Sequence, residues 1–322
     1  MIESGEPTAT VDAVTEQSLL GGPRRYTRDQ VAELSGVPVE RARKLWVAMG
    51  FAAAASDDEP AFTDADVAAV RAFAAMDPIA GASERSQIAA ARTLGQAMAR
   101  LAEWQADMIT RELRDADPAA TTRTVAVLTE LQNYAWRRHL AAAIARASDT
   151  NGATRSLLVG FADMVGYTRL SRHLDPDELA ELLEAFESAT TEAITAHGGW
   201  VIKNVGDEVM FAAETPAQGA RIALALHTAT AEAAQRIPEM PQLRVGLAYG
   251  PVLTRFGDLY GTVVNVAARL TGVARPGTVL LDDGAAAALT DDEHFALRHL
   301  RGVRVKGFSR LRSHVLRERK RR

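Results

Sequence analysis

The sequence predicts an α+β fold in its C-terminal half, a mixed sheet covered by helices, preceded by an all-helical N-terminal half. Two observations lead to this prediction. In the first half, apolar residues recur at three- and four-residue steps, as at Leu94, Met98 and Leu101, which is the period of an amphipathic helix. In the second half, short apolar runs alternate with amphipathic stretches, which indicates strands, hairpins and helices in one domain.

A turn-rich break separates the two halves. Residues 148–152 are Ser-Asp-Thr-Asn-Gly, all of which favour turns. The first 22 residues are small and polar, so we expect a flexible leader there. We therefore predict a leader at 1–22, a helical domain at 23–150 and an α+β domain at 151–322.

Proline, glycine and turn residues mark the expected boundaries of helices and strands in each half. In the helical half, Pro78 and Pro118 mark expected helix boundaries. In the α+β half, Gly198-Gly199 ends a helix, and a tight turn at residues 204–207 joins two strands. We expect strands at 157–161, 200–203, 208–213, 243–249, 278–281, 296–300 and 312–316, with helices at 176–197, 216–236 and 262–274.

Composition excludes several classes of protein. Without cysteine, the chain has no disulfide, thiolate zinc site or cysteine nucleophile. A net charge of −4 argues against a chain that coats nucleic acid or anionic membrane. The longest uncharged run, residues 45–56, is shorter than the roughly 20 residues of a membrane helix. We expect a cytoplasmic protein.

Three strings stand where expected strands end or helices begin. They are Phe161-Ala162-Asp163-Met164-Val165-Gly166-Tyr167-Thr168, Lys203-Asn204-Val205-Gly206-Asp207 and Asp258-Leu259-Tyr260-Gly261-Thr262-Val263-Val264-Asn265-Val266-Ala267-Ala268-Arg269. Asp163 ends an apolar strand and Asp207 begins another, so the two carboxylates can face each other across neighbouring strands. Mg²⁺ and Mn²⁺ prefer such oxygens. At Gly166 and Thr168 the backbone can approach phosphates closely. A lone strand-end Asp would instead be a turn former or a helix cap.

In this order and spacing, the three strings resemble the catalytic domain of the class III nucleotidyl cyclases, which make cyclic AMP or cyclic GMP from the triphosphate. The resemblance covers roughly residues 155–316. It implies a signal-transduction lyase in which the ribose 3′-hydroxyl attacks the α-phosphate and pyrophosphate leaves. It also implies two ions per site, Mg²⁺ or Mn²⁺, held by Asp163 and Asp207.

The resemblance also assigns the nucleotide contacts. Lys203 and Asp258 match the base-reading pair of the adenylate members, whereas guanylate members typically carry Glu and Cys. A Lys donor and an Asp acceptor suit N1 and N6 of adenine, and guanine would leave both mispaired. The implied substrate is therefore ATP.

Three further positions match the family's catalytic and phosphate-binding residues. Asn265 and Arg269 are four residues apart on an expected helix, so they share one face. In the family this pair orients the ribose and stabilises the transferring phosphate. Lys306, between Val305 and Gly307, resembles the lysine that binds the triphosphate.

The spacing of the motifs bears on assembly. Lys203 and Asp207 lie too close in sequence to contact opposite ends of one ATP from a single turn. The family solves this by head-to-tail homodimerisation, with the carboxylates from one subunit and the base reader and Asn/Arg pair from the other. We therefore expect a homodimer with two equivalent sites.

The first half leaves two interpretations. Residues 26–46 resemble the helix-turn-helix opening of MerR-type regulators, which would contact DNA through Arg41, Arg43 and Lys44. The same helix pair can instead serve packing and regulation, and the acidic residues 57–59 do not favour a phosphate footprint. The whole chain resembles actinobacterial-type adenylate cyclases whose all-helical N-terminal half regulates the catalytic dimer. We expect that function, without a nucleic-acid or membrane partner; the alternative is a DNA-binding transcriptional regulator with a nucleotide-sensing cyclase-like domain.

Overall fold

A computed structural model of the chain describes residues 16–52, 56–75, 83–112, 118–148, 154–305 and 308–319. The chain divides into two compact units, Met1–Ser148 and Asp149–Arg322. None of the helices in the described ranges combines the length and apolarity that a membrane crossing requires.

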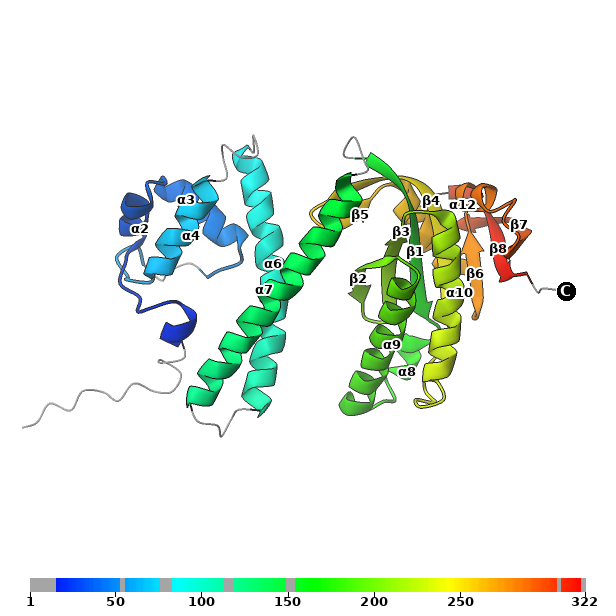
Figure 1. Cartoon of the computed structure of the whole chain (residues 1–322), viewed down its shortest axis with the longest axis horizontal. Coiled ribbons are helices and arrows are strands. Elements are labelled where there is room, and N and C mark those ends of the chain that lie inside the picture. The colour runs from blue at the N-terminus through cyan, green and yellow to red at the C-terminus, as the bar shows by residue number, and fades with distance from the viewer. Residues whose placement is uncertain are drawn as a thin grey trace, which may run out of the picture. The chain divides into compact units, whose positions relative to one another are not determined.

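The C-terminal unit is built on one mixed sheet of eight strands (Figure 1). The strands are β1 Thr154–Met164, β2 Trp200–Val205, β3 Glu208–Ala213, β4 Leu243–Arg255, β5 Asp258–Tyr260, β6 Thr278–Leu281, β7 Phe295–Val305 and β8 Phe308–Glu318. Their order is β2-β3-β1-β4-β6-β8-β7, with β5 paired to β4. Only the β4–β6 pair is parallel among the strand pairs of the described residues.

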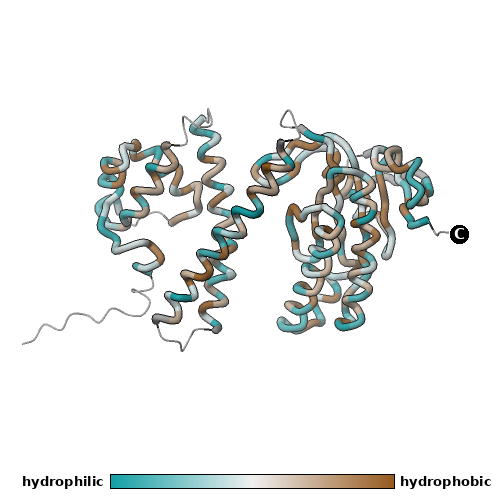
Figure 2. The backbone as a smooth tube through the Cα atoms, in the orientation of Figure 1, coloured by the Kyte–Doolittle hydropathy of each residue, from teal (hydrophilic) through white to brown (hydrophobic). Residues whose placement is uncertain are grey.

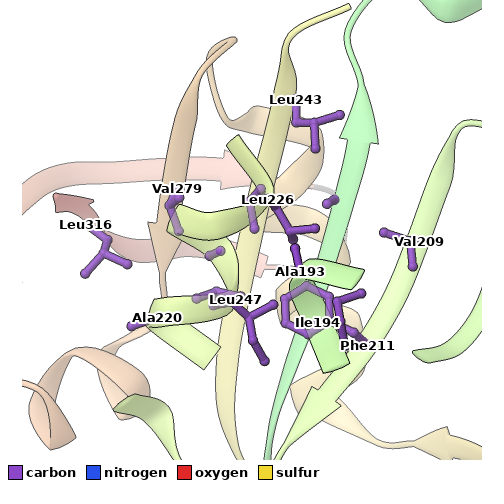
Figure 3. Close-up of a cluster of buried hydrophobic side chains, with 14 of the residues drawn as sticks. Ala193, Ile194, Val209, Phe211, Ala220, Leu226, Leu243, Leu247, Val279 and Leu316 are labelled. Atoms are coloured by element: carbon purple, nitrogen blue, oxygen red, sulfur yellow. The ribbon is translucent and has the colours of Figure 1, made fainter. Parts of the chain in front are cut away.

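Helices cover both faces of this sheet. They are α8 Tyr167–Leu170, α9 Pro176–Ala196, α10 Pro216–Ala233, α11 Thr262–Val273 and α12 Asp283–Ala288. On the face covered by α9 and α10, Ile194 and Leu226 pack with Phe211, Leu247 and Val279 from the strands (Figure 3). Alternate residues along each strand point to opposite faces, so each strand supplies both cores.

Helix α11 lies close against the second face. Its buried residues Val263, Val266 and Leu270 pack with Phe161 of β1 and its neighbours. A Cβ atom on Gly246 of β4 would lie 2.5 Å from the carbonyl oxygen of Ala267, so only glycine allows this approach.

The regular structure in the described residues of the N-terminal unit is helical, apart from an isolated β-bridge between Tyr26 and Phe62. The helices are α2 Arg28–Ser35, α3 Val39–Ala48, α4 Asp64–Ala75, α6 Glu84–Glu112 and α7 Pro118–Ser148. A small core gathers side chains from α2, α3 and α4, among them Val31, Ala42 and Val67.

The predicted fold class is confirmed: an α+β unit follows a helical one. Pro118 begins α7 as expected, whereas Pro78 and the leader residues 1–15 lie outside the described residues. The structure adds β5, the four-residue helix α8 and α12, which the sequence pattern did not predict. A three-residue strand is too short to show alternation, and Asp283–Ala288 contains only Asp, Gly and Ala, so it has no apolar period.

Candidate active site

Three charged residues form a row across the centre of the sheet. The register places Asp163 of β1 opposite Glu208 of β3 on one side and opposite Arg244 of β4 on the other. Directly opposed residues project to the same face. Asp163 shares the orientation of Phe161, two residues earlier, which packs in the core beneath α11. The row therefore lies on the α11 face.

Asp163 is nearly buried, with 8% of its surface exposed. Its Oδ2 accepts a hydrogen bond from Nε of Arg244, which forms an ion pair. Nη1 of Arg244 also donates to the carbonyl oxygen of Gly272, at 3.3 Å. The guanidinium thus places a positive charge directly against the Asp163 carboxylate.

Asp207 is held beside Asp163 by the backbone. The amide of Met164 donates to the carbonyl oxygen of Asp207 at 3.0 Å, which ties the β2–β3 turn to the end of β1. Burial raises the pKa of Asp207, and the charge of Asp163 and a hydrogen bond with it raise this pKa further. The structure therefore brings together the two predicted metal carboxylates, and two oxygen donors that repel each other fit Mg²⁺ or Mn²⁺.

Glu208 is the third acidic group at this position, after Asp163 and Asp207. It is half-buried at the start of β3. Its pKa is raised to about 7, first by burial and then by the charges of Asp163 and Asp207. Negative charge is therefore concentrated at this point beyond what Arg244 balances.

Lys203 and Asp258 meet although 55 residues separate them in sequence. Nζ of Lys203 donates to Oδ2 of Asp258 at 2.5 Å, and the side chains are 42% and 27% exposed. A register shift after Val201 places Lys203 opposite Met210, and Met210 packs in the core on the α11 face. Asp258 begins β5, so the unpredicted short strand positions one member of this pair.

Asn265 and Arg269 share one side of α11 and are both exposed. The opposite side of the helix is buried through Val263, Val266 and Leu270. Within the described ranges, no hydrogen bond or ion pair joins Asn265 or Arg269 to either aspartate. The chain thus carries this pair on a surface that faces away from its own sheet.

The remaining predicted residues flank the carboxylates or fall outside the described part. Gly166 has a φ of 82°, a left-handed conformation that favours glycine, and it precedes the four-residue helix α8. Thr168 in α8 is exposed. Lys306 lies outside the described residues.

Sequence reasoning missed Arg244 and Glu208. Each is an ionisable residue at the edge of an otherwise apolar, buried strand, and that contrast was the available signal. Their place beside Asp163 depends on the register of three strands, which alternation alone does not fix.

The basic residues considered for DNA contact are engaged within the N-terminal unit. Arg41 donates to Gln87 of α6 at 2.6 Å, and Lys44 donates to Glu84 of α6 at 2.8 Å. Arg43 pairs with Glu40 of its own helix at 3.0 Å. These contacts pack α3 against α6, so no observation favours the DNA-binding alternative.

The sequence is similar to known cyclases over most of its length. Residues 152–318 match the family described as the adenylate and guanylate cyclase catalytic domain. An adenylate cyclase of Streptomyces coelicolor is 42% identical over 288 residues, covering 85% of this chain and 74% of the relative. One from Streptomyces griseus is 42% identical over 299 residues, covering 88% and 73%. One from Glutamicibacter nicotianae is 36% identical over 346 residues, covering 98% and 85%.

Proposed function

Since the chain belongs to the class III nucleotidyl cyclase family, we propose that it converts ATP into 3′,5′-cyclic AMP and pyrophosphate. The observation that carries this choice of nucleotide is the Lys203–Asp258 pair, whose polar atoms lie 2.5 Å apart. A lysine donor beside a carboxylate acceptor matches the N1 acceptor and N6 donor of adenine. A buried unpaired polar group costs roughly 1–3 kcal/mol, so guanine would be rejected.

Asp163 and Asp207 hold the divalent ions of this reaction, Mg²⁺ or Mn²⁺, two per site. When bound, such ions lower the pKa of the attacking hydroxyl and stabilise charge on the phosphates. The two adjacent carboxylates support the assignment, because the charge of Asp163 raises the pKa of Asp207 and a bound cation would offset this repulsion. Gly166 and Thr168 lie next to Asp163 and would contact the phosphates, and Lys306 is assigned to the triphosphate.

Asn265 and Arg269 act from a second copy of the chain. Both side chains lie on the exposed side of α11, away from the sheet that carries the aspartates. In a head-to-tail homodimer, this surface would meet the partner's carboxylates, where Asn orients the ribose and Arg neutralises charge on the transferring phosphate. Exposed Leu253, Phe256 and Tyr260 on the β4–β5 hairpin supply apolar surface for such a contact.

The helical N-terminal unit regulates this activity. The relatives of this chain in Streptomyces and Glutamicibacter align with most of its length, so the helical unit and the catalytic domain occur together in them. An assay of cyclic nucleotide formation with ATP and with GTP, on the full chain and on residues 153–322, tests both the reaction and the regulation. Cyclic AMP formation that differs between the two proteins supports the proposal; no cyclic AMP from either contradicts it.

Exchanging the base-reading pair tests the choice of nucleotide. Lys203→Glu together with Asp258→Cys inverts the hydrogen-bond polarity at the base. We expect kcat/KM for ATP to fall at least about tenfold, with a smaller gain for GTP because guanine also needs room. Steady-state kinetics with both nucleotides measure the effect. Unchanged ATP kinetics would show that these residues do not read the base.

Mixing two inactive variants tests the shared site. Asp163→Ala and Asn265→Ala chains are each expected to be inactive alone. In a mixed head-to-tail dimer both lesions fall in one site and the other site is intact, so random pairing restores about a quarter of wild-type activity. Mixtures that exchange subunits yet stay inactive would place each site within a single chain.

A further inference from the structure

Glu208 is an acidic residue of the active-site face that the proposed reaction does not use. It stands directly opposite Asp163 in the β1–β3 register and follows Asp207 in sequence. It is half-buried, and no ion pair joins it to a basic side chain in the described ranges. A half-buried carboxylate without a cationic partner is costly, because burial disfavours its charged form.

The charges in this row suggest why a glutamate stands there. Asp163 has Glu208 on one side and the Arg244 guanidinium on the other. When all groups are ionised, Asp163, Asp207 and Arg244 together carry one net negative charge. With Glu208 the net charge is two negative, which doubles the negative charge available to attract divalent cations. Without Glu208, the ion pair with Arg244 would leave the aspartates a weak cation site.

We propose that the charge of Glu208 offsets that of Arg244 and so raises the affinity of Asp163 and Asp207 for a divalent cation, without Glu208 itself binding the ion. The proposal rests on the assignment of Asp163 and Asp207 to the metal under the proposed function. Among the described residues, no three acidic or histidine side chains are arranged around one ion position. Glu208 therefore acts through its charge beside Asp163 and not as a ligand of the ion.

Manganese binding in the absence of nucleotide separates this role from a structural one. The full chain, stripped of metal, is titrated with Mn²⁺, and free ion is followed by electron paramagnetic resonance. Glu208→Gln keeps the shape and removes the charge, so we expect the Kd for Mn²⁺ to rise about tenfold. Glu208→Asp keeps the charge and is expected to bind more tightly than Glu208→Gln.

A matched control and a stability measurement complete the experiment. Glu184→Gln removes the same charge from an exposed position on α9, on the opposite face of the sheet, and is expected to bind Mn²⁺ like wild type. Because Glu208→Gln removes a carboxylate that stands opposite Asp163 and next to Asp207, its melting temperature in metal-free buffer is expected to equal or exceed that of wild type. A purely structural residue would show a lower melting temperature.

The outcomes distinguish this proposal from the one on which it depends. Asp163→Asn and Asp207→Asn should each abolish tight Mn²⁺ binding; if neither does, the metal assignment itself is wrong. If they do, but Glu208→Gln binds Mn²⁺ with wild-type affinity, then the charge of Glu208 does not raise the affinity of the site. The same conclusion follows if Glu208→Asp binds no more tightly than Glu208→Gln.

Discussion

The two units use apolar residues in different ways. In the C-terminal unit, Phe186 and Phe211 in the core under α9 and α10, and Val159 and Leu270 in the core under α11, are all 0% exposed. In α7, none of residues 120–147 is buried, and Tyr134 and Trp136 are 64% and 57% exposed. Figure 2 shows that apolar stretches nevertheless occur in both units. Hydropathy therefore predicts where helices and strands form, but does not decide whether their apolar faces are covered.

This difference shows which parts of the fold are stabilised by contacts within the unit. The sheet and α9, α10 and α11 enclose their apolar surface within one unit, which supplies the main folding free energy. The N-terminal unit has a smaller core, centred on Val31, Phe62 and Val67. A long helix with little burial gains little from packing, so α7 depends more on its own helix propensity.

The largest expected effect falls on catalysis in the C-terminal unit. Asp163→Ala and Asp207→Ala should each lower kcat/KM for ATP by at least about a thousandfold, or roughly 4 kcal/mol, because either carboxylate is required to hold the ions. Asp107→Ala removes a similar charge from exposed α6 and should change activity less than about twofold. Cyclic AMP formation at saturating Mn²⁺ measures all three. Near-native activity of either site variant would contradict the metal assignment.

Much of the C-terminal fold was predictable because its signals are local. The turn between β2 and β3, the helix end at Gly198-Gly199 and the apolar run before Asp163 are each signalled within a few residues. Lys203 and Asp258 were paired through the motifs of a known family rather than from geometry. The structure places their side chains together, while their roles remain the proposal made above.

What was not predictable depends on contacts between distant segments. The row of Glu208, Asp163 and Arg244 arises from strand register, which period-two alternation leaves open. The packing of α3 on α6 through Lys44 and Glu84 likewise joins residues 40 positions apart. A helix-turn-helix pattern in the sequence does not specify whether its second helix faces DNA or the protein's own core.

A matched pair of leucine substitutions sharpens the comparison of the two units. Leu182 of α9 is 0% exposed and Leu140 of α7 is 41% exposed. Leu182→Ala should lower the free energy of unfolding by about 2–5 kcal/mol, because it removes buried methyl groups and leaves a cavity. Leu140→Ala should change it by less than about 0.5 kcal/mol, since a large part of the side chain is already in water and alanine favours a helix. Urea-induced unfolding of the full-length variants measures both.

The Leu140 result decides what the exposed face of α7 means. A change in unfolding free energy below about 0.5 kcal/mol would show that this face is exposed to water in solution, as it is in the structure of the unit. A loss above about 2 kcal/mol, as large as that of a buried leucine, would show that the face is covered in solution. If that loss grew with protein concentration, the covering surface would belong to another copy of the chain, because only association makes stability depend on concentration. The apolar residues of α7 would then be buried only when two copies associate. The two units would differ in that the C-terminal unit buries its core within one chain, whereas α7 buries its apolar face between chains.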